Sequence, residues 1–150
     1  MVHQRTNQYR QQTGLDPVSW DEKLSNVARG HSQDMALRGY FAHETPEGVD
    51  PTGRAESLGY KCEKIIGNLI YKGIAENIFQ NNLYDVVWYT GDIPTSYEWN
   101  TQGEIAQTTV DGWMESTGHR KNILTEMYNK EGIGVEIGAD DKVYITQNFC

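Results

Sequence analysis

Residues 132–149 read GIGVEIGADDKVYITQNF, and this stretch decides the fold class. Apolar residues alternate with other residues over 133–137, which is the period of a half-buried strand. Residues 139–142 have the composition of a turn. The alternation resumes over 143–149, where Gln147 interrupts the apolar face. The stretch therefore predicts an antiparallel hairpin at the end of the sequence.

Helical periodicity dominates the first third of the chain. Residues 21–38 form the clearest predicted helix, with Asp21 at its positive N-terminal end and Gly39 as its stop. Its predicted buried stripe consists of residues spaced three or four apart: Leu24, Val27, Ala28, His31 and Met35. A more polar helix is predicted over 2–12, and another over 104–117. Helices followed by a hairpin indicate an α+β fold, with an antiparallel sheet covered by helices.

Three further segments are predicted from composition. Residues 44–57 are rich in proline and glycine and are expected to form a loop. Residues 65–78 mix β-branched residues with glycine and are expected to cross the core. Residues 80–103 are expected to form a long irregular segment with many aromatic residues. Its aromatic side chains either cover the core as a lid, which we favour, or wall a ligand groove.

Length and charge limit the possible functions. A chain of 150 residues fits one domain spanning 1–150, and we expect a monomer. The formal net charge of −8 argues against nucleic acid as a partner, and the pair Arg120–Lys121 is too small a basic patch to change that. No stretch approaches the roughly 20 apolar residues of a transmembrane helix. Residues 1–5 lack the apolar region of a signal peptide.

The two cysteines, Cys62 and Cys150, leave two alternatives open. They are either free thiols or partners in one disulfide that closes a loop of about 90 residues, worth about 4.5 kcal/mol in the loop-entropy model. We favour the disulfide, because a free cysteine near a chain end is a liability outside the cell.

Three residues in separate segments are candidates for chemistry. His43 follows a predicted helix, and by itself it would anchor a loop. Glu76 lies among apolar residues, so it is expected to be drawn inside and to need a partner such as a backbone N–H or Arg54. His119 follows Gly118 at a predicted helix end, where it would interact with the helix terminus. Spacing alone does not connect the three.

Two further patterns favour structural interpretations. His31 lies on the apolar stripe of its helix and is predicted to be a hydrogen-bonded core histidine. Ser116 and His119 are three residues apart, but a serine nucleophile with a histidine base needs a third, orienting group, and none is identifiable.

Taken together in order, the motifs resemble the CAP superfamily (cysteine-rich secretory, antigen 5 and pathogenesis-related proteins), in its compact microbial form. The resemblance covers nearly the whole chain. It rests on NQYR (7–10), WDEKL (20–24), ARGHSQDMA (28–36), YFAH (40–43), AENI (75–78), GHR (118–120), NIL (122–124), GIGV (132–135) and YITQNF (144–149). It implies an α–β–α sandwich, with a small antiparallel sheet between helical layers, outside the cell or at its surface.

The resemblance also implies a cleft in which two histidines and two glutamates hold Zn²⁺ or another divalent metal. His43, Glu76 and His119 match three of the four positions. The fourth is Ser116 in this chain, and Glu115 is one residue too early, so it is expected to point elsewhere. Two histidines and a carboxylate can still hold zinc with one open position.

Three functions follow as hypotheses. The first is a secreted binding or interaction module without turnover, whose partner is a protein, a lipid or a cell-envelope ligand. The second is a metal-dependent hydrolase of peptides or esters, in which Glu76 or Ser116 would orient a zinc-bound water. The third is a lipid or sterol carrier gated by the aromatic segment. We favour the first.

Overall fold

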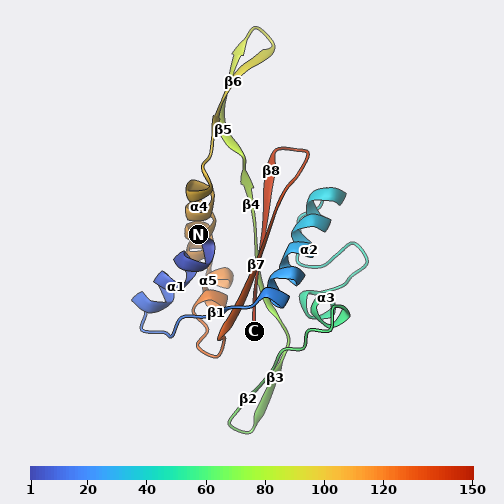
Figure 1. Ribbon diagram of the computed structural model, residues 1–150, viewed down its shortest axis with the longest axis vertical. Helices are drawn as coiled ribbons and strands as arrows, with labels where there is room; N and C mark the ends of the chain where they lie inside the picture. The colour runs from blue at the N-terminus through green and yellow to red at the C-terminus, as the bar shows by residue number, and fades with distance from the viewer.

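The computed structural model describes residues 1–150 and shows a central sheet with helices on both faces (Figure 1). Its elements follow in the order α1 (Val2–Gln12), β1 (Ser19–Trp20), α2 (Glu22–Arg38), α3 (Pro51–Ser57), β2 (Glu63–Ile66), β3 (Leu69–Lys72), β4 (Ala75–Asn82), β5 (Tyr84–Thr90), β6 (Ile93–Trp99), α4 (Gln102–Glu115), α5 (Thr117–Ile123), β7 (Lys130–Ile137) and β8 (Lys142–Phe149).

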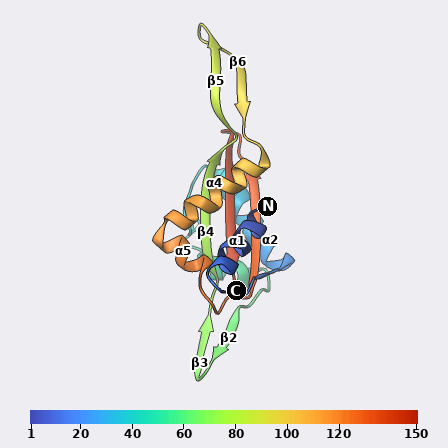
Figure 2. The same ribbon diagram turned by 90° about the vertical axis from the view of Figure 1, so that its left-hand side faces the viewer.

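The central sheet has the strand order β1-β7-β8-β4. Strands β7 and β8 form the predicted antiparallel hairpin, β4 is antiparallel to β8, and the short β1 is parallel to β7. Helices α2 and α3 lie on one face, while α1, α4 and α5 lie on the other (Figures 1 and 2). The fold is therefore the expected α–β–α sandwich.

Helix α2 begins and ends where its sequence predicts. The Asp21 side chain accepts a hydrogen bond from Leu24 N at 3.0 Å, which caps the helix, and Gly39 ends it in the left-handed conformation with φ 68°. The predicted stripe from Leu24 to Met35 is buried throughout. The 3.6-residue period therefore identified the face of α2 that covers the sheet.

The packing of α2 on β7 depends on two glycines. A Cβ atom built on Gly132 or Gly134 would lie well under 3.0 Å from the backbone of α2, a distance that real Cβ atoms essentially never show. Ser32 Oγ lies 3.1 Å from Gly134 O and 2.9 Å from Thr146 Oγ1, and it is fully buried. Helix and strand backbones therefore lie in direct contact, with one buried hydroxyl fixing their register.

Three expectations from composition were wrong. Residues 51–57 form α3 rather than loop, because Asp50 caps Gly53 N at 2.7 Å and Pro51 occupies the first helical turn. The segment 65–78 does not cross the core as a unit: β2 and β3 form a hairpin that projects from the body, and the core crossing begins with β4.

The aromatic segment 80–103 is also regular. Strands β5 and β6 form a second projecting hairpin at the opposite end of the molecule (Figures 1 and 2). Its aromatic side chains pack on one another, with Tyr97 and Trp99 rings 5.2 Å apart, and Trp88 and Trp99 are more than half exposed. The favoured idea that they cover the core as a lid is therefore wrong.

The disulfide alternative for the cysteines is confirmed. Cys62 and Cys150 are bonded, with Cα atoms 5.7 Å apart and a separation of 88 positions in sequence. The bond joins the segment before β2 to the residue that follows β8, and both cysteines are buried. It therefore anchors the base of the β2–β3 hairpin to the central sheet.

The contact between α2 and β7 gives the first prediction. We expect Gly134→Ala to lower the free energy of unfolding by more than about 2 kcal/mol, because the helix backbone must move off the strand. The matched control is Gly30→Ala in the exposed face of α2, where an added Cβ meets nothing within 4 Å. Alanine is about 0.5–1 kcal/mol more favourable there. Urea denaturation of both variants measures the difference, and equal midpoints would contradict the close contact.

Candidate functional site

The structure brings His43, Glu76 and His119 together from three elements. His43 lies in the loop between α2 and α3, Glu76 is the second residue of β4, and His119 lies within α5. His43 Nδ1 is 3.0 Å from Glu76 Oε1, and the His43 and His119 rings have centroids 6.4 Å apart. Residues that are 33 and 43 positions apart in sequence thus form one group, which we call the histidine–glutamate cluster.

Two asparagines hold α5 against β4 beneath this cluster. Asn77 Nδ2 donates to His119 O at 3.2 Å, and Asn122 Nδ2 lies 3.1 Å from Glu76 O and 2.8 Å from Asn77 Oδ1. The expectation that His119 follows the end of the helix over 104–117 was wrong, since α4 ends at Glu115 and a separate helix begins at Thr117. The break places His119 on α5, where these amides fix it beside Glu76.

Glu76 is buried and fully engaged by its neighbours. Its side chain is 1% exposed, and Arg54 Nη2 donates to Oε2 at 2.5 Å. Arg54 also donates to His43 O at 2.7 Å and to Val49 O at 3.0 Å. The expected arginine partner is therefore confirmed, and it links the carboxylate to the loop that carries His43.

His31 lies behind the carboxylate, on α2. Its side chain is fully buried, with Nε2 2.9 Å from Ala42 O and 3.7 Å from Glu76 Oε1. Since the carbonyl oxygen only accepts, Nε2 carries the proton, and Nδ1 is left without a partner. Burial lowers the pKa of His31, so its ring is neutral at pH 7. The predicted core histidine is thus hydrogen-bonded through one nitrogen only.

His119 is also favoured in its neutral form. Partial burial lowers its pKa, and the nearby His43 lowers it further.

Ser116 is the residue between α4 and α5, whereas Glu115 is exposed on the last turn of α4. No group of three or more His, Cys, Asp or Glu side chains has the arrangement of a metal site.

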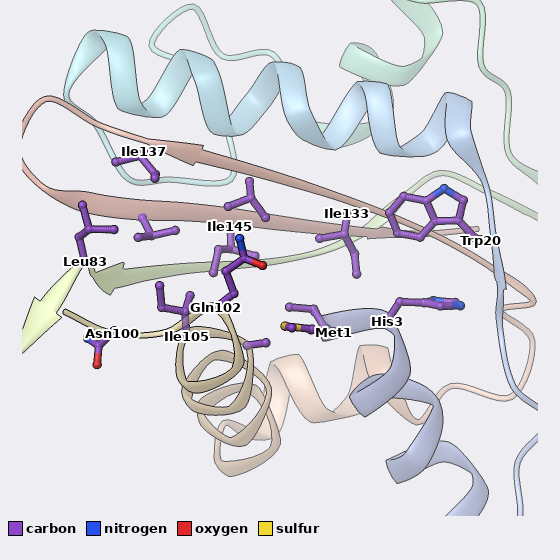
Figure 3. A pocket seen from close by; sticks show the side chains of 14 residues that line it. Met1, His3, Trp20, Leu83, Asn100, Gln102, Ile105, Ile133, Ile137 and Ile145 are labelled. Carbon is purple, nitrogen blue, oxygen red and sulfur yellow. The ribbon is translucent and has the colours of Figure 1, made fainter.

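A second feature, an apolar groove of about 590 Å³, was not predicted from the sequence (Figure 3). It lies between the start of α1, the start of α4 and the face of β7 and β8 that is turned toward these two helices (Figure 3). Its lining is mostly hydrophobic: Met1, Val2, His3, Trp20, Leu83, Asn100, Gln102, Ile105, Ala106, Ile133, Val135, Ile137, Val143 and Ile145. Ile137 is 54% exposed, so this part of the sheet is not covered by helix.

The sequence matches the model of the cysteine-rich secretory protein family, CAP, over residues 3–149, and the chain belongs to this family. It is 33% identical to the uncharacterized protein YkwD of Bacillus subtilis over 139 residues, which cover 92% of this chain and 42% of YkwD. The chain therefore spans less than half the length of that relative.

Solved structures agree with this assignment. An extracellular protein with an SCP domain from Bacillus anthracis has a TM-score of 0.67 and 26% identity, over 99% of this chain and 38% of that one. An outer surface protein of Borrelia burgdorferi has a TM-score of 0.70 over 99% of this chain and 87% of that one; at 14% identity it supports the fold alone.

None of the helices in the present structure has the length and apolar content needed to cross a membrane.

The buried ion pair of the cluster gives the second prediction. We expect Arg54→Ala to lower the free energy of unfolding by about 3 kcal/mol or more, because it leaves the Glu76 carboxylate buried without its partner. The matched control is Arg38→Ala, since Arg38 Nη2 contacts Glu47 at the same 2.5 Å in an exposed position. Screening by water makes that surface pair worth little. Thermal and urea unfolding of both variants test this, and similar losses would mean that burial does not govern the Glu76 pair.

Proposed function

We propose that this chain is an extracellular CAP domain that acts as a binding module rather than as an enzyme. The observation that carries this proposal is the state of Glu76, the carboxylate at the centre of the cluster. One oxygen is engaged by His43 and the other by Arg54, and the side chain is 1% exposed. A general base must reach the proton that it removes, and this carboxylate is instead committed to holding the cluster together.

The disulfide supports a location outside the cell. Bonds of this kind persist in oxidising compartments, and Cys62–Cys150 joins two parts of the chain 88 residues apart. The similarity to an extracellular SCP-domain protein of Bacillus anthracis is consistent with this location. Extracellular placement would expose His43, which is 49% accessible, to ligands outside the cell.

We further propose that His43 and His119 can hold a divalent ion of the zinc type. Because Glu76 only accepts hydrogen bonds, the contact at 3.0 Å places the proton of neutral His43 on Nδ1 and leaves a lone pair on Nε2. The lowered pKa of His119 favours its neutral ring, the form that binds a metal ion. Glu76 then acts as a positioning residue, as carboxylates beside zinc-bound histidines do.

Two imidazoles alone are expected to bind such an ion only weakly, since Ser116 stands where the family resemblance implies a second glutamate. When bound, the ion would supply an open coordination position to which a donor atom of a ligand could attach. This would give the cluster a role in recognition without requiring a reaction.

The third prediction concerns this ion. We expect calorimetric titration with Zn²⁺ at neutral to slightly alkaline pH to show weak binding that His119→Ala abolishes and Ser116→Glu strengthens. Binding should fall as the pH drops below about 6.5, because the ion competes with protons for the imidazoles. Glu115→Ala is the matched control, since this exposed carboxylate is adjacent in sequence to Ser116.

Two results would contradict the proposal. Unchanged zinc binding in His119→Ala would place any metal elsewhere. Turnover of a peptide or an ester that disappears in His43→Ala would show that the cluster is a reaction centre, in favour of the hydrolase hypothesis.

The apolar groove supports a second candidate, binding of a lipid chain. Its volume of about 590 Å³ lies in the usual range for small-molecule sites, and eleven of its fourteen lining residues are hydrophobic. The fourth prediction is that a fluorescent fatty acid binds the wild type and binds Ile137→Glu at least about tenfold more weakly, because a charge would enter the lining. Leu58→Glu is the control, as Leu58 is 65% exposed outside the groove. Equal binding by both variants would remove this candidate.

A further inference from the structure

The hairpin formed by β2 and β3, which we call the β2–β3 arm (residues 63–72), ends in an exposed aliphatic tip. It projects beyond the sheet at the end of the molecule opposite to β5 and β6 (Figures 1 and 2). Four side chains form the tip, and their exposed fractions are 79% for Ile65, 47% for Ile66, 75% for Leu69 and 62% for Ile70. Gly67, with φ 59°, allows the tight turn between them.

The tip is apolar on both of its faces. Ile65 pairs with Ile70 and Ile66 pairs with Leu69, and successive residues of a strand point to opposite faces. A protein partner that packed against one face would leave the pair on the other face in water. Surroundings that take up both faces at once, such as the acyl region of a lipid bilayer, would remove all four side chains from water.

Positive charge lies behind this tip. Lys61, Lys64 and Lys72 lie at the base of the β2–β3 arm, where Glu63 is already paired with Lys72 at 3.0 Å. The projecting hairpin at the opposite end contains Asp85, Asp92 and Glu98 and no basic residue. In a chain with a net charge of −8, the lysines therefore make this end the one suited to an anionic surface.

The base of the arm is fixed to the body of the protein. The disulfide of Cys62 immediately precedes β2, and Tyr71 OH lies 3.0 Å from Tyr128 OH. Lys64 Nζ donates to Asn129 at 2.5 Å. With a rise of about 3.3 Å per residue, the two apolar pairs reach roughly 7 Å beyond this base. That length matches the depth of about 5–10 Å at which interfacial segments lie in the boundary between headgroups and acyl chains.

We propose that the β2–β3 arm docks this protein on a lipid surface. The aliphatic tip inserts among the acyl chains, and the exposed Lys61 and Lys72 at its base contact anionic headgroups. The anchored base holds the arm in place before binding, which reduces the conformational entropy lost on insertion. This inference is independent of the proposed roles of the histidine–glutamate cluster and of the apolar groove.

The test is sedimentation of the whole chain with vesicles of phosphatidylcholine containing about one third phosphatidylglycerol, an anionic lipid to which basic segments bind. The wild type is expected to bind these vesicles, to bind pure phosphatidylcholine less, and to release as salt is raised. The double variant Ile65→Ser/Ile70→Ser should bind at least about tenfold more weakly, since two buried aliphatic side chains are lost. Because both residues are exposed, this variant should fold normally.

The matched control is Trp88→Ser/Ile93→Ser, which removes two exposed apolar side chains from the hairpin of β5 and β6. It should bind the vesicles as the wild type does. Failure of the wild type to bind anionic vesicles, or equal binding by the tip variant, would overturn the proposal. So would light scattering that shows a dimer in solution which the tip variant abolishes, because the tip would then be a contact between copies.

Discussion

The contact between α2 and β7 is the constraint on which the rest of the structure depends. Gly132 and Gly134 remove the side chains that would otherwise separate helix and strand, so the two backbones touch. The buried Ser32 hydroxyl then fixes the register through Gly134 and Thr146. Because α2 cannot shift along the sheet, its C-terminal end at Gly39 has a fixed position, and so does the loop with His43 that follows.

The fixed position of α2 also explains how the Glu76 carboxylate can be buried under the loop that carries His43. Position 31 of α2 faces the sheet, which puts the neutral His31 ring within 3.7 Å of Glu76 Oε1. Arg54 approaches from α3 and neutralises the carboxylate at 2.5 Å. Desolvation of the carboxylate is therefore offset by an ion pair and a histidine hydrogen bond. This arrangement organises His43 and His119 while it leaves Glu76 little freedom to act on a substrate.

The sequence predicted the parts of the fold in which one face is buried. Periodicity identified α2 and the hairpin of β7 and β8, because in both the apolar residues repeat with the period of the element. It failed for β2–β3 and β5–β6, whose apolar residues are exposed, since β-branched and aromatic composition does not distinguish a projecting hairpin from a core strand. Helix α3 was missed because its proline and glycine were taken as loop residues, although Asp50 and Pro51 begin the helix. Sequence spacing alone does not predict that His43, Glu76 and His119 share one site. The family resemblance grouped these residues, and the packing of α5 against β4 explains why they meet.

The two ends of the molecule differ in charge, and the histidine–glutamate cluster belongs to elements near the end that carries the β2–β3 arm. Glu76 follows Lys72, the last residue of the β2–β3 arm, by only four positions, and α3 and α5 lie toward this same end of the sheet (Figure 1). An arm anchored by the disulfide cannot pivot freely about its base, so insertion of its tip would hold the cluster near the headgroups rather than far from them. Ligands that diffuse along a lipid surface would then meet His43 at a high local concentration, because confinement near a site raises effective concentration without any new contact. The acidic hairpin of β5 and β6 would point away from the anionic surface, which gives the docked protein a single orientation.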